Sequence, residues 1–104
     1  MSSDALRSEF ALAGPVALIA FRGELELATA DRAGDQLHAL LEAGAREVLV
    51  DLTDTTFLDC AGIGALVEAA RAAHARGGRL YVQRAQGQAR QVIEQARVGA
   101  SARL

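Results

Sequence analysis

The residues most able to carry chemistry lie in one short segment, TFLDCAGIGAL, residues 56–66. Its carboxylate, Asp59, is followed directly by Cys60, which is the single cysteine of the chain. Two glycines, Gly62 and Gly64, then fall where a helix is expected to begin. A thiol between a carboxylate and a helix start is either a reactive group, or it occupies a place where another residue type would do chemistry.

Cys60 has few of the neighbours that a catalytic or redox-active thiol needs. A helix N-terminus favours the thiolate form, but the adjacent Asp59 carboxylate opposes it. Both histidines, His38 and His74, fall within expected helices and far from Cys60 in sequence. One cysteine also cannot form an internal disulfide. We therefore predict no catalytic residue and interpret Cys60 as a small inert residue, by analogy with buried structural thiols.

Asp59 has two compatible roles in such a segment. It can cap the helix that starts near Ala61, which contributes about 0.5–2 kcal/mol, and it can also face a partner. The glycines let the helix start lie close to the sheet or to a partner backbone. A bound phosphate is disfavoured, because residues 47–70 contain no Lys or Arg to anchor it.

Composition excludes several classes of protein. A chain of 104 residues, 51% hydrophobic and 23% charged, is expected to form one globular domain. The net charge of −2 and four aromatic residues argue against nucleic-acid binding or an anionic lipid surface. The N-terminus MSSDALRSEF does not resemble a signal peptide, and no apolar run approaches the roughly 20 residues of a membrane span. We therefore expect a cytoplasmic, bacterial-type protein without membrane insertion.

Strands are predicted in two parts of the chain. Residues 10–13 and 16–21 are two short strands, and Gly14-Pro15 between them is typical of a hairpin. The nearly continuous apolar run EVLVDL, 47–52, is typical of a parallel strand buried on both faces. RLYVQ, 79–83, is a further strand.

Three helices are predicted from apolar residues at helical spacing. Thr29 or Asp31 can cap the first helix, and Gly44 can supply the left-handed residue at its end. The second helix follows Asp59 and ends at Gly77-Gly78. The inward residues are Ala33, Leu37, Leu40 and Leu41 in the first helix, Ile63, Leu66, Val67, Ala70, Ala73 and His74 in the second, and Val92, Ile93 and Ala96 in a weaker third helix over 88–97.

This order of elements predicts an α/β domain. Strand–helix–strand units require parallel strands joined by right-handed crossovers, so helices should pack on a mostly parallel four-stranded sheet that begins with a hairpin. One domain is expected over 1–104, with a core at about 8–98 and a frayed tail at 99–104. Functional groups in such sheets gather beyond the carboxyl ends of the strands, where TFLDCAGIGAL is placed.

Three segments at this spacing resemble the STAS domain family, and the resemblance covers about residues 8–98. They are GELEL at 23–27, EVLVDLTDTTFLDCAGIGAL at 47–66 and GGRLYV at 77–82. The most specific part is residues 59–64, which is similar to the family element D-S-[ST/A]-G-[LI]-G after an apolar strand. G-E-L-[DE] at 23–26 is independent support. The resemblance implies the STAS-like fold of bacterial anti-sigma factor antagonists.

In that family the hydroxyl after the motif Asp is phosphorylated by a histidine-kinase-like anti-sigma factor, and a PP2C-type phosphatase removes the phosphate. The unphosphorylated domain binds the anti-sigma factor. Phosphate adds about −1.5 to −2 charge beside a carboxylate, so repulsion and desolvation break the contact. Here Cys60 occupies that position and Ala61 also lacks a hydroxyl, while Thr55 or Thr56 stays open as an acceptor.

The resemblance implies an anti-sigma factor antagonist that is not an enzyme and needs no cofactor or metal. Its partner-binding residues are expected where neighbouring strands end. The alternatives are a non-phosphorylated STAS subunit of another assembly, such as a lipid-transport complex or a signalling scaffold, and lastly a thiol redox sensor. The expected partner-binding residues are Glu26, which stands where the family often has Asp, and Asp59, Cys60, Ala61, Gly62 and Ile63.

Overall fold

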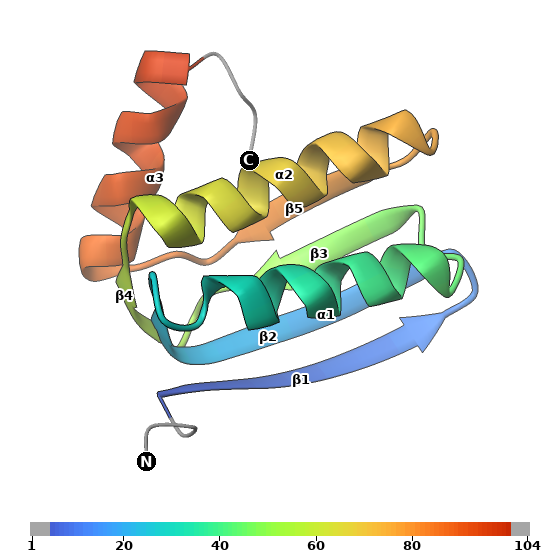
Figure 1. The fold of residues 1–104 in the computed structure, drawn as a ribbon, viewed down its shortest axis with the longest axis horizontal. Helices are drawn as coiled ribbons and strands as arrows, with labels where there is room; N and C mark the ends of the chain where they lie inside the picture. Colours follow the sequence, from blue (N-terminus) through green and yellow to red (C-terminus); the bar gives the residue numbers. More distant parts are fainter. Residues whose placement is uncertain (1–4, 101–104) are drawn as a thin grey trace.

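The computed structural model describes residues 5–100 and confirms an α/β fold that opens with a β-hairpin (Figure 1). Residues 99 and 100 belong to the last helix, and the rest of the predicted frayed tail, 101–104, lies outside the described residues. The elements are β1 (Leu6–Ala13), β2 (Val16–Leu25), α1 (Ala30–Glu42), β3 (Glu47–Asp51), β4 (Thr55–Leu58), α2 (Cys60–Ala75), β5 (Arg79–Gln83) and α3 (Gly87–Ala100).

The sheet has five strands, one more than predicted. Its order is β1-β2-β3-β5, and β4 pairs with the end of β2. β1 runs antiparallel to β2, and the other pairs are parallel. The prediction omitted β4 because this four-residue strand begins with two threonines and shows no clear apolar period.

Both strands of the hairpin are longer than predicted, and Gly23 allows β2 to continue to Leu25. Gly23 has a φ of 106°. A Cβ on Gly23 would lie 2.2 Å from the carbonyl oxygen of Ala5. Only glycine meets both demands, so this residue lets β2 reach its second partner, β4.

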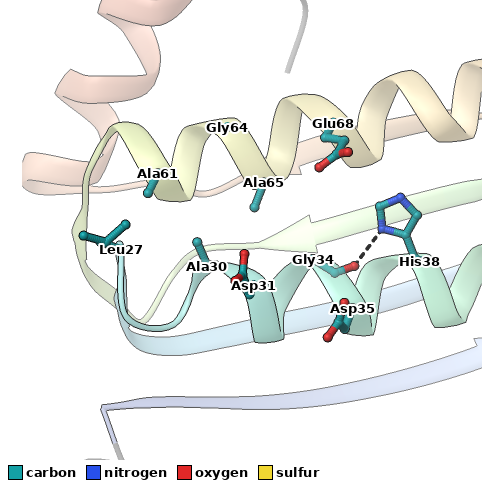
Figure 2. Close-up of a pocket in the computed structure, with 10 residues that line it drawn as sticks. All are labelled: Leu27, Ala30, Asp31, Gly34, Asp35, His38, Ala61, Gly64, Ala65 and Glu68. Atoms are coloured by element: carbon teal, nitrogen blue, oxygen red, sulfur yellow. Dashed lines mark hydrogen bonds between the residues drawn. The ribbon is translucent and has the colours of Figure 1, made fainter.

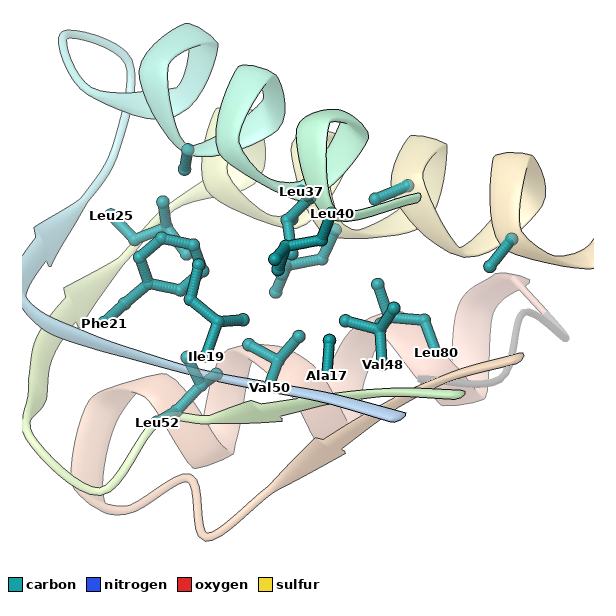
Figure 3. Close-up of a cluster of buried hydrophobic side chains, with 14 of the residues drawn as sticks. Ala17, Ile19, Phe21, Leu25, Leu37, Leu40, Val48, Val50, Leu52 and Leu80 are labelled. Carbon is teal, nitrogen blue, oxygen red and sulfur yellow. The ribbon is translucent and has the colours of Figure 1, made fainter. Parts of the chain in front are cut away.

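Most of the hydrophobic core lies between one face of the sheet and the helices α1 and α2, and Ala89 and Ile93 of α3 add to it. Figure 3 shows side chains of β2 and β3 pointing toward Leu37 and Leu40 of α1. All four residues predicted for the inner face of α1 are buried. Gly44, with φ 111°, ends this helix as predicted, because Ala45 N–H then reaches the carbonyl of Leu40.

Two predictions about burial, for β3 and for His74, need correction. β3 is not buried on both faces: Val48 and Val50 are fully buried, whereas Leu49 stays partly exposed because α1 and α2 cover only one face. His74 is exposed, since the buried face of α2 is rotated relative to the predicted one. Of the α3 residues, Ile93 is buried and Val92 partly so, while the side chain of Ala96 lies outside the described residues. The buried residues of α2 are Gly62, Leu66, Ala69 and Ala73, with Ile63, Val67 and Ala70 packed partly against the core.

Within residues 5–100, no helix is long and apolar enough to cross a membrane. α3 packs against β4 at the end of the sheet. There the side chain of Gln88 bonds both backbone groups of Leu58, accepting from its N–H at 2.9 Å and donating to its carbonyl at 2.7 Å. This contact places the strand that precedes Asp59.

Candidate partner-binding site

The carboxyl ends of β2 and β4 lie side by side. Leu25 is opposite Leu58 in the parallel ladder, so Glu26 and Asp59 follow at neighbouring positions. The N–H of Asp59 donates to the carbonyl of Leu25 at 3.4 Å. The structure thus brings together the two segments that sequence analysis placed at neighbouring strand ends.

Asp59 joins the start of α2 to the loop after β2. One carboxylate oxygen accepts from the N–H of Gly62 at 3.0 Å, which confirms the predicted helix cap. The other accepts from the N–H of Leu27 at 3.2 Å. The N–H of Gly62, one of the donors that a bound anion would need, is therefore taken by a carboxylate of the chain itself.

The loop between Leu25 and Ala30 is held by its own hydrogen bonds. The hydroxyl of Thr29 donates to the carbonyl of Glu24 at 2.7 Å and accepts from the N–H of Glu26 at 3.1 Å. The carboxylate of Glu26 accepts from the N–H of Ala28 at 3.1 Å. Thr29 is the N-cap residue of α1 but its side chain does not bond the helix, so its role is to fix this loop.

Leu27 is the site residue that sequence analysis missed. Its side chain is 77% exposed although its backbone is fixed by Asp59. In sequence, Leu27 belongs to GELEL, a segment that sequence analysis used for the family resemblance and assigned to no strand, helix or loop. Its position could have indicated a site residue, because Leu27 lies between the motif residue Glu26 and the start of a helix. An apolar side chain in such a loop is not expected to be buried in the core.

Cys60 is exposed as the first residue of α2. The analogy with buried structural thiols is therefore wrong, because the helix turns this position outward. Ala61 and Ile63 are partly buried, whereas Gly62 is buried against the sheet. A Cβ on Gly62 would lie 2.3 Å from the carbonyl oxygen of Leu25, but one on Gly64 would meet open space.

Two of the threonines before the motif, Thr53 and Thr55, form hydrogen bonds within the fold. Thr55 is buried and its hydroxyl donates to the carbonyl of Phe21 at 2.9 Å. The hydroxyl of Thr53 donates to the Asp51 carboxylate at 2.6 Å, and the Thr53 N–H donates to the same oxygen at 2.9 Å. Thr56 is exposed on β4.

The contacts made by Thr53 shift the pKa of the Asp51 carboxyl group. The hydroxyl of Thr53, then its backbone N–H, and more weakly the charges of Arg84 and Arg22 lower the pKa of Asp51 below its ordinary value of 3.8, against a small opposing effect of burial. The carboxylate form thus stabilises the turn between β3 and β4, which leads the chain into the site.

An open groove between α1 and α2 borders the site (Figure 2). Several of the residues that line the groove are small, and one of them is Gly64, the exposed glycine of the motif. His38 contacts the carbonyl of Gly34 through Nδ1 at 2.9 Å. Among residues 5–100, no group of three or more acidic, histidine or cysteine side chains is arranged to hold a metal ion. The lining residues are Leu27, Ala30, Asp31, Gly34, Asp35, His38, Ala61, Gly64, Ala65 and Glu68.

Comparison with solved structures found the same fold in several regulators. The anti-sigma factor antagonist SpoIIAA in its unphosphorylated form is 16% identical, with a TM-score of 0.78 over 89% of this chain and 83% of that one. The Bacillus cell fate determinant SpoIIAA in the phosphorylated form is 17% identical, with a TM-score of 0.72 over 89% and 86%. An anti-sigma factor antagonist from Mycobacterium paratuberculosis is 19% identical, with a TM-score of 0.76 over 97% and 86%.

Comparison of the sequence with curated proteins found no match. The family model of the STAS domain matches residues 9–103, which is nearly the whole chain and includes every residue of the site described above. The motif at residues 59–64 lies at the start of α2, in a fold whose sheet begins with a β-hairpin. The chain belongs to the STAS domain family.

Proposed function

We propose that this chain is a cytoplasmic anti-sigma factor antagonist that binds a histidine-kinase-like anti-sigma factor. The docking surface consists of the exposed or partly exposed residues at the two strand ends, and Gly62 supports it from beneath. Family membership and the fold shared with proteins named anti-sigma factor antagonists support this role. The residues of the docking surface are Glu26, Leu27, Asp59, Cys60, Ala61 and Ile63.

The observation that carries the proposal is the position of Cys60. It is exposed, begins α2, and follows the carboxylate that fixes Leu27 beside it. A surface whose loop and helix are already joined loses little conformational entropy on binding. The same position carries a thiol and not a hydroxyl, so we propose a regulatory, non-catalytic domain that a kinase-like partner cannot switch off at residue 60.

Phosphorylation and binding can be tested with one purified partner, a kinase-like anti-sigma factor encoded in the same genome. Incubation with this partner and ATP should leave the intact mass of the chain unchanged. Cys60→Ser should restore a phosphate acceptor and give a mass increase of one phosphate. A phosphate on the wild-type chain, at Cys60, Thr55 or Thr56, would show that phosphorylation can still regulate this protein.

Affinity is the second half of this test and is measured by calorimetry. Cys60→Asp places a second carboxylate beside Asp59 and should weaken binding about tenfold or more, through like-charge repulsion and desolvation. Glu42→Ala, an exposed residue at the far end of α1, is the control and should bind as wild type. Thermal unfolding of each variant verifies its fold. Unchanged affinity of a folded Cys60→Asp variant would place the partner surface elsewhere.

A second candidate is a STAS subunit of another assembly, such as a lipid-transport complex or a signalling scaffold. The absence of a hydroxyl at residues 60 and 61 favours it, because such an assembly needs no phosphate switch. In that case the kinase-like partners would fail to bind, and a PP2C-type phosphatase would have no role. Co-purification with a transport ATPase, reproduced with the two purified proteins, would identify this alternative.

A further inference from the structure

β1 forms one edge of the sheet, and its hydrogen-bonding pattern shows which backbone groups are left on the outside. In an antiparallel ladder, opposed residues alternate between hydrogen-bonded and non-hydrogen-bonded pairs. The N–H of Glu24 donates to the carbonyl of Ala5 at 2.7 Å, and the N–H of Gly23 turns instead to Asp54 at 3.0 Å. The odd-numbered residues of β1 therefore bond β2.

The even-numbered residues of β1 direct their backbone groups away from the sheet. The carbonyl of Leu6 accepts from the guanidinium of Arg32, so that group is already used. Within residues 5–100, the outward N–H and C=O groups of Ser8, Phe10 and Leu12 have no backbone partner and lie in a row along this edge. The register of β1 against β2 is unbroken, so no bulge turns the edge away.

The side chains on this edge are unusually apolar for an edge strand. Phe10 is 66% exposed and Leu12 is 39% exposed. Natural sheets usually protect an edge with charged residues, especially lysine, with proline or with a bulge. Residues 6–13 contain neither lysine nor proline, and the two charged residues, Arg7 and Glu9, stand at odd positions whose backbone groups bond β2. An unprotected edge with an exposed aromatic side chain is a template for one more strand.

We propose that two copies of this chain associate by antiparallel pairing of their β1 strands, about a two-fold axis at Phe10. Hydrogen bonds between the two copies form only where an even-numbered residue of one β1 strand lies opposite an even-numbered residue of the other, because only these residues direct their backbone groups outward. The register centred on Phe10 is the one that pairs all three outward residues among themselves, Phe10 with Phe10 and Ser8 with Leu12 of the second copy. Each β1 strand thereby donates three N–H groups and accepts at three carbonyls.

The charges of β1 also favour this register, and the unbroken, self-complementary pattern of its outward backbone groups fits a second copy as the occupant. Centring the pair on Glu9 would set two carboxylates opposite each other, which is destabilising. Centring it on Phe10 places Glu9 opposite Ala11 and Arg7 opposite Ala13. The pair of Phe10 rings then lies on the axis, and the two sheets become one continuous sheet with no unprotected β1 edge.

Pairing through β1 leaves free the part of the docking surface at the start of α2. In Figure 1, α1 lies between β1 and α2, so the start of α2 is remote from this edge. The dimer would carry two docking surfaces, one on each copy.

Sedimentation velocity of the full chain over micromolar to millimolar concentrations tests the dimer. Wild type should shift from monomer to dimer as the concentration rises. Phe10→Lys places a charge at the centre of the edge and should shift the protein toward monomer. Leu18→Lys is the matched control, because Leu18 is also exposed, at 45%, but lies on the open face of β2. It should dimerise as wild type.

Cysteine cross-linking in a Cys60→Ala background tests the register. The Cα atoms of a hydrogen-bonded antiparallel pair are about 5.5 Å apart, within disulfide range. Phe10→Cys should therefore form a disulfide dimer on oxidation, whereas Glu9→Cys, which faces Ala11 of the second copy, should not. A wild-type chain that stays monomeric at all concentrations overturns the proposal. So does a dimer lost in Leu18→Lys but kept in Phe10→Lys, or equal cross-linking at both positions.

Discussion

The two oxygens of Asp59 bind N–H groups of different elements, and this double contact fixes Leu27 beside the start of α2. The glycines that follow have unequal roles in the same contact. Gly62 lies against the carbonyl of Leu25, where a side chain has no room, whereas Gly64 faces the open groove. The motif therefore needs its first glycine for packing and its second for neither packing nor backbone conformation.

Two alanine substitutions test this difference. In Gly62→Ala the Cβ would lie 2.3 Å from a backbone oxygen and 2.7 Å from Leu58 Cδ1, so α2 must shift. We expect a loss of about 1–3 kcal/mol in the free energy of unfolding. Gly64→Ala meets nothing within 4 Å, and should gain about 0.5–1 kcal/mol from lower backbone entropy of the unfolded chain. Urea denaturation measures both, and equal stability of the two variants would contradict the assignment.

The turn between β3 and β4 is the element that delivers the chain to Asp59. Its carboxylate, Asp51, accepts two hydrogen bonds from Thr53. Because these contacts lower the pKa of Asp51 in the folded chain, the ionised form stabilises the fold at pH values above the ordinary value of 3.8. This stabilisation disappears as the pH falls through the lowered pKa.

The pH dependence of stability should reveal this contribution. Between about pH 5 and pH 2, the free energy of unfolding of wild type should fall more steeply than that of Asp51→Asn, which cannot ionise. Thr53→Val, which removes the hydroxyl donor but keeps the backbone N–H, should be intermediate. Denaturant titrations at a series of pH values measure the slopes. An Asp51→Asn variant with the wild-type slope would show that other carboxylates control acid unfolding.

At the scale of the whole molecule, a single core joins the sheet to all three helices. Phe21 is the largest of its fully buried side chains and packs beneath α1 (Figure 3). Its backbone carbonyl also receives the hydroxyl of Thr55 from β4. Phe21 therefore fills the core with its side chain and helps to position β4 through its backbone carbonyl.

Phe21→Ala should cost about 3–5 kcal/mol, the transfer of the ring plus the cavity left behind. Domains of this kind are stable by only about 5–15 kcal/mol, so the variant should unfold at much lower urea concentration, in one transition. Phe57→Ala, at a position 42% exposed on β4, is the control and should lose far less. Similar losses for the two variants would mean that the core is not centred on Phe21.

Local patterns in the sequence were enough for the fold class, the inner face of α1 and the cap at Asp59. Apolar spacing and capping residues act over a few positions, and such signals can be read from one strand or helix alone. The motif at 59–64 also identified the family. Its carboxylate caps the start of a helix, and its first glycine lets that helix lie close to the backbone of β2. Glu26 and Asp59 were expected at neighbouring strand ends, and they lie there in the structure, although β4, the strand that leads to Asp59, was not predicted.

Only the tertiary structure decided which faces stay uncovered and which distant groups meet. The exposure of Leu49, His74 and Cys60 depends on how α1 and α2 lie on the sheet, which no local period records. β4 was missed because its pairing with β2, and not its own four residues, makes it a strand. The contact from Asp59 to Leu27 joins two loops that are neighbours only once the sheet has formed. Long-range pairing determines these features, so the chain must fold before they exist.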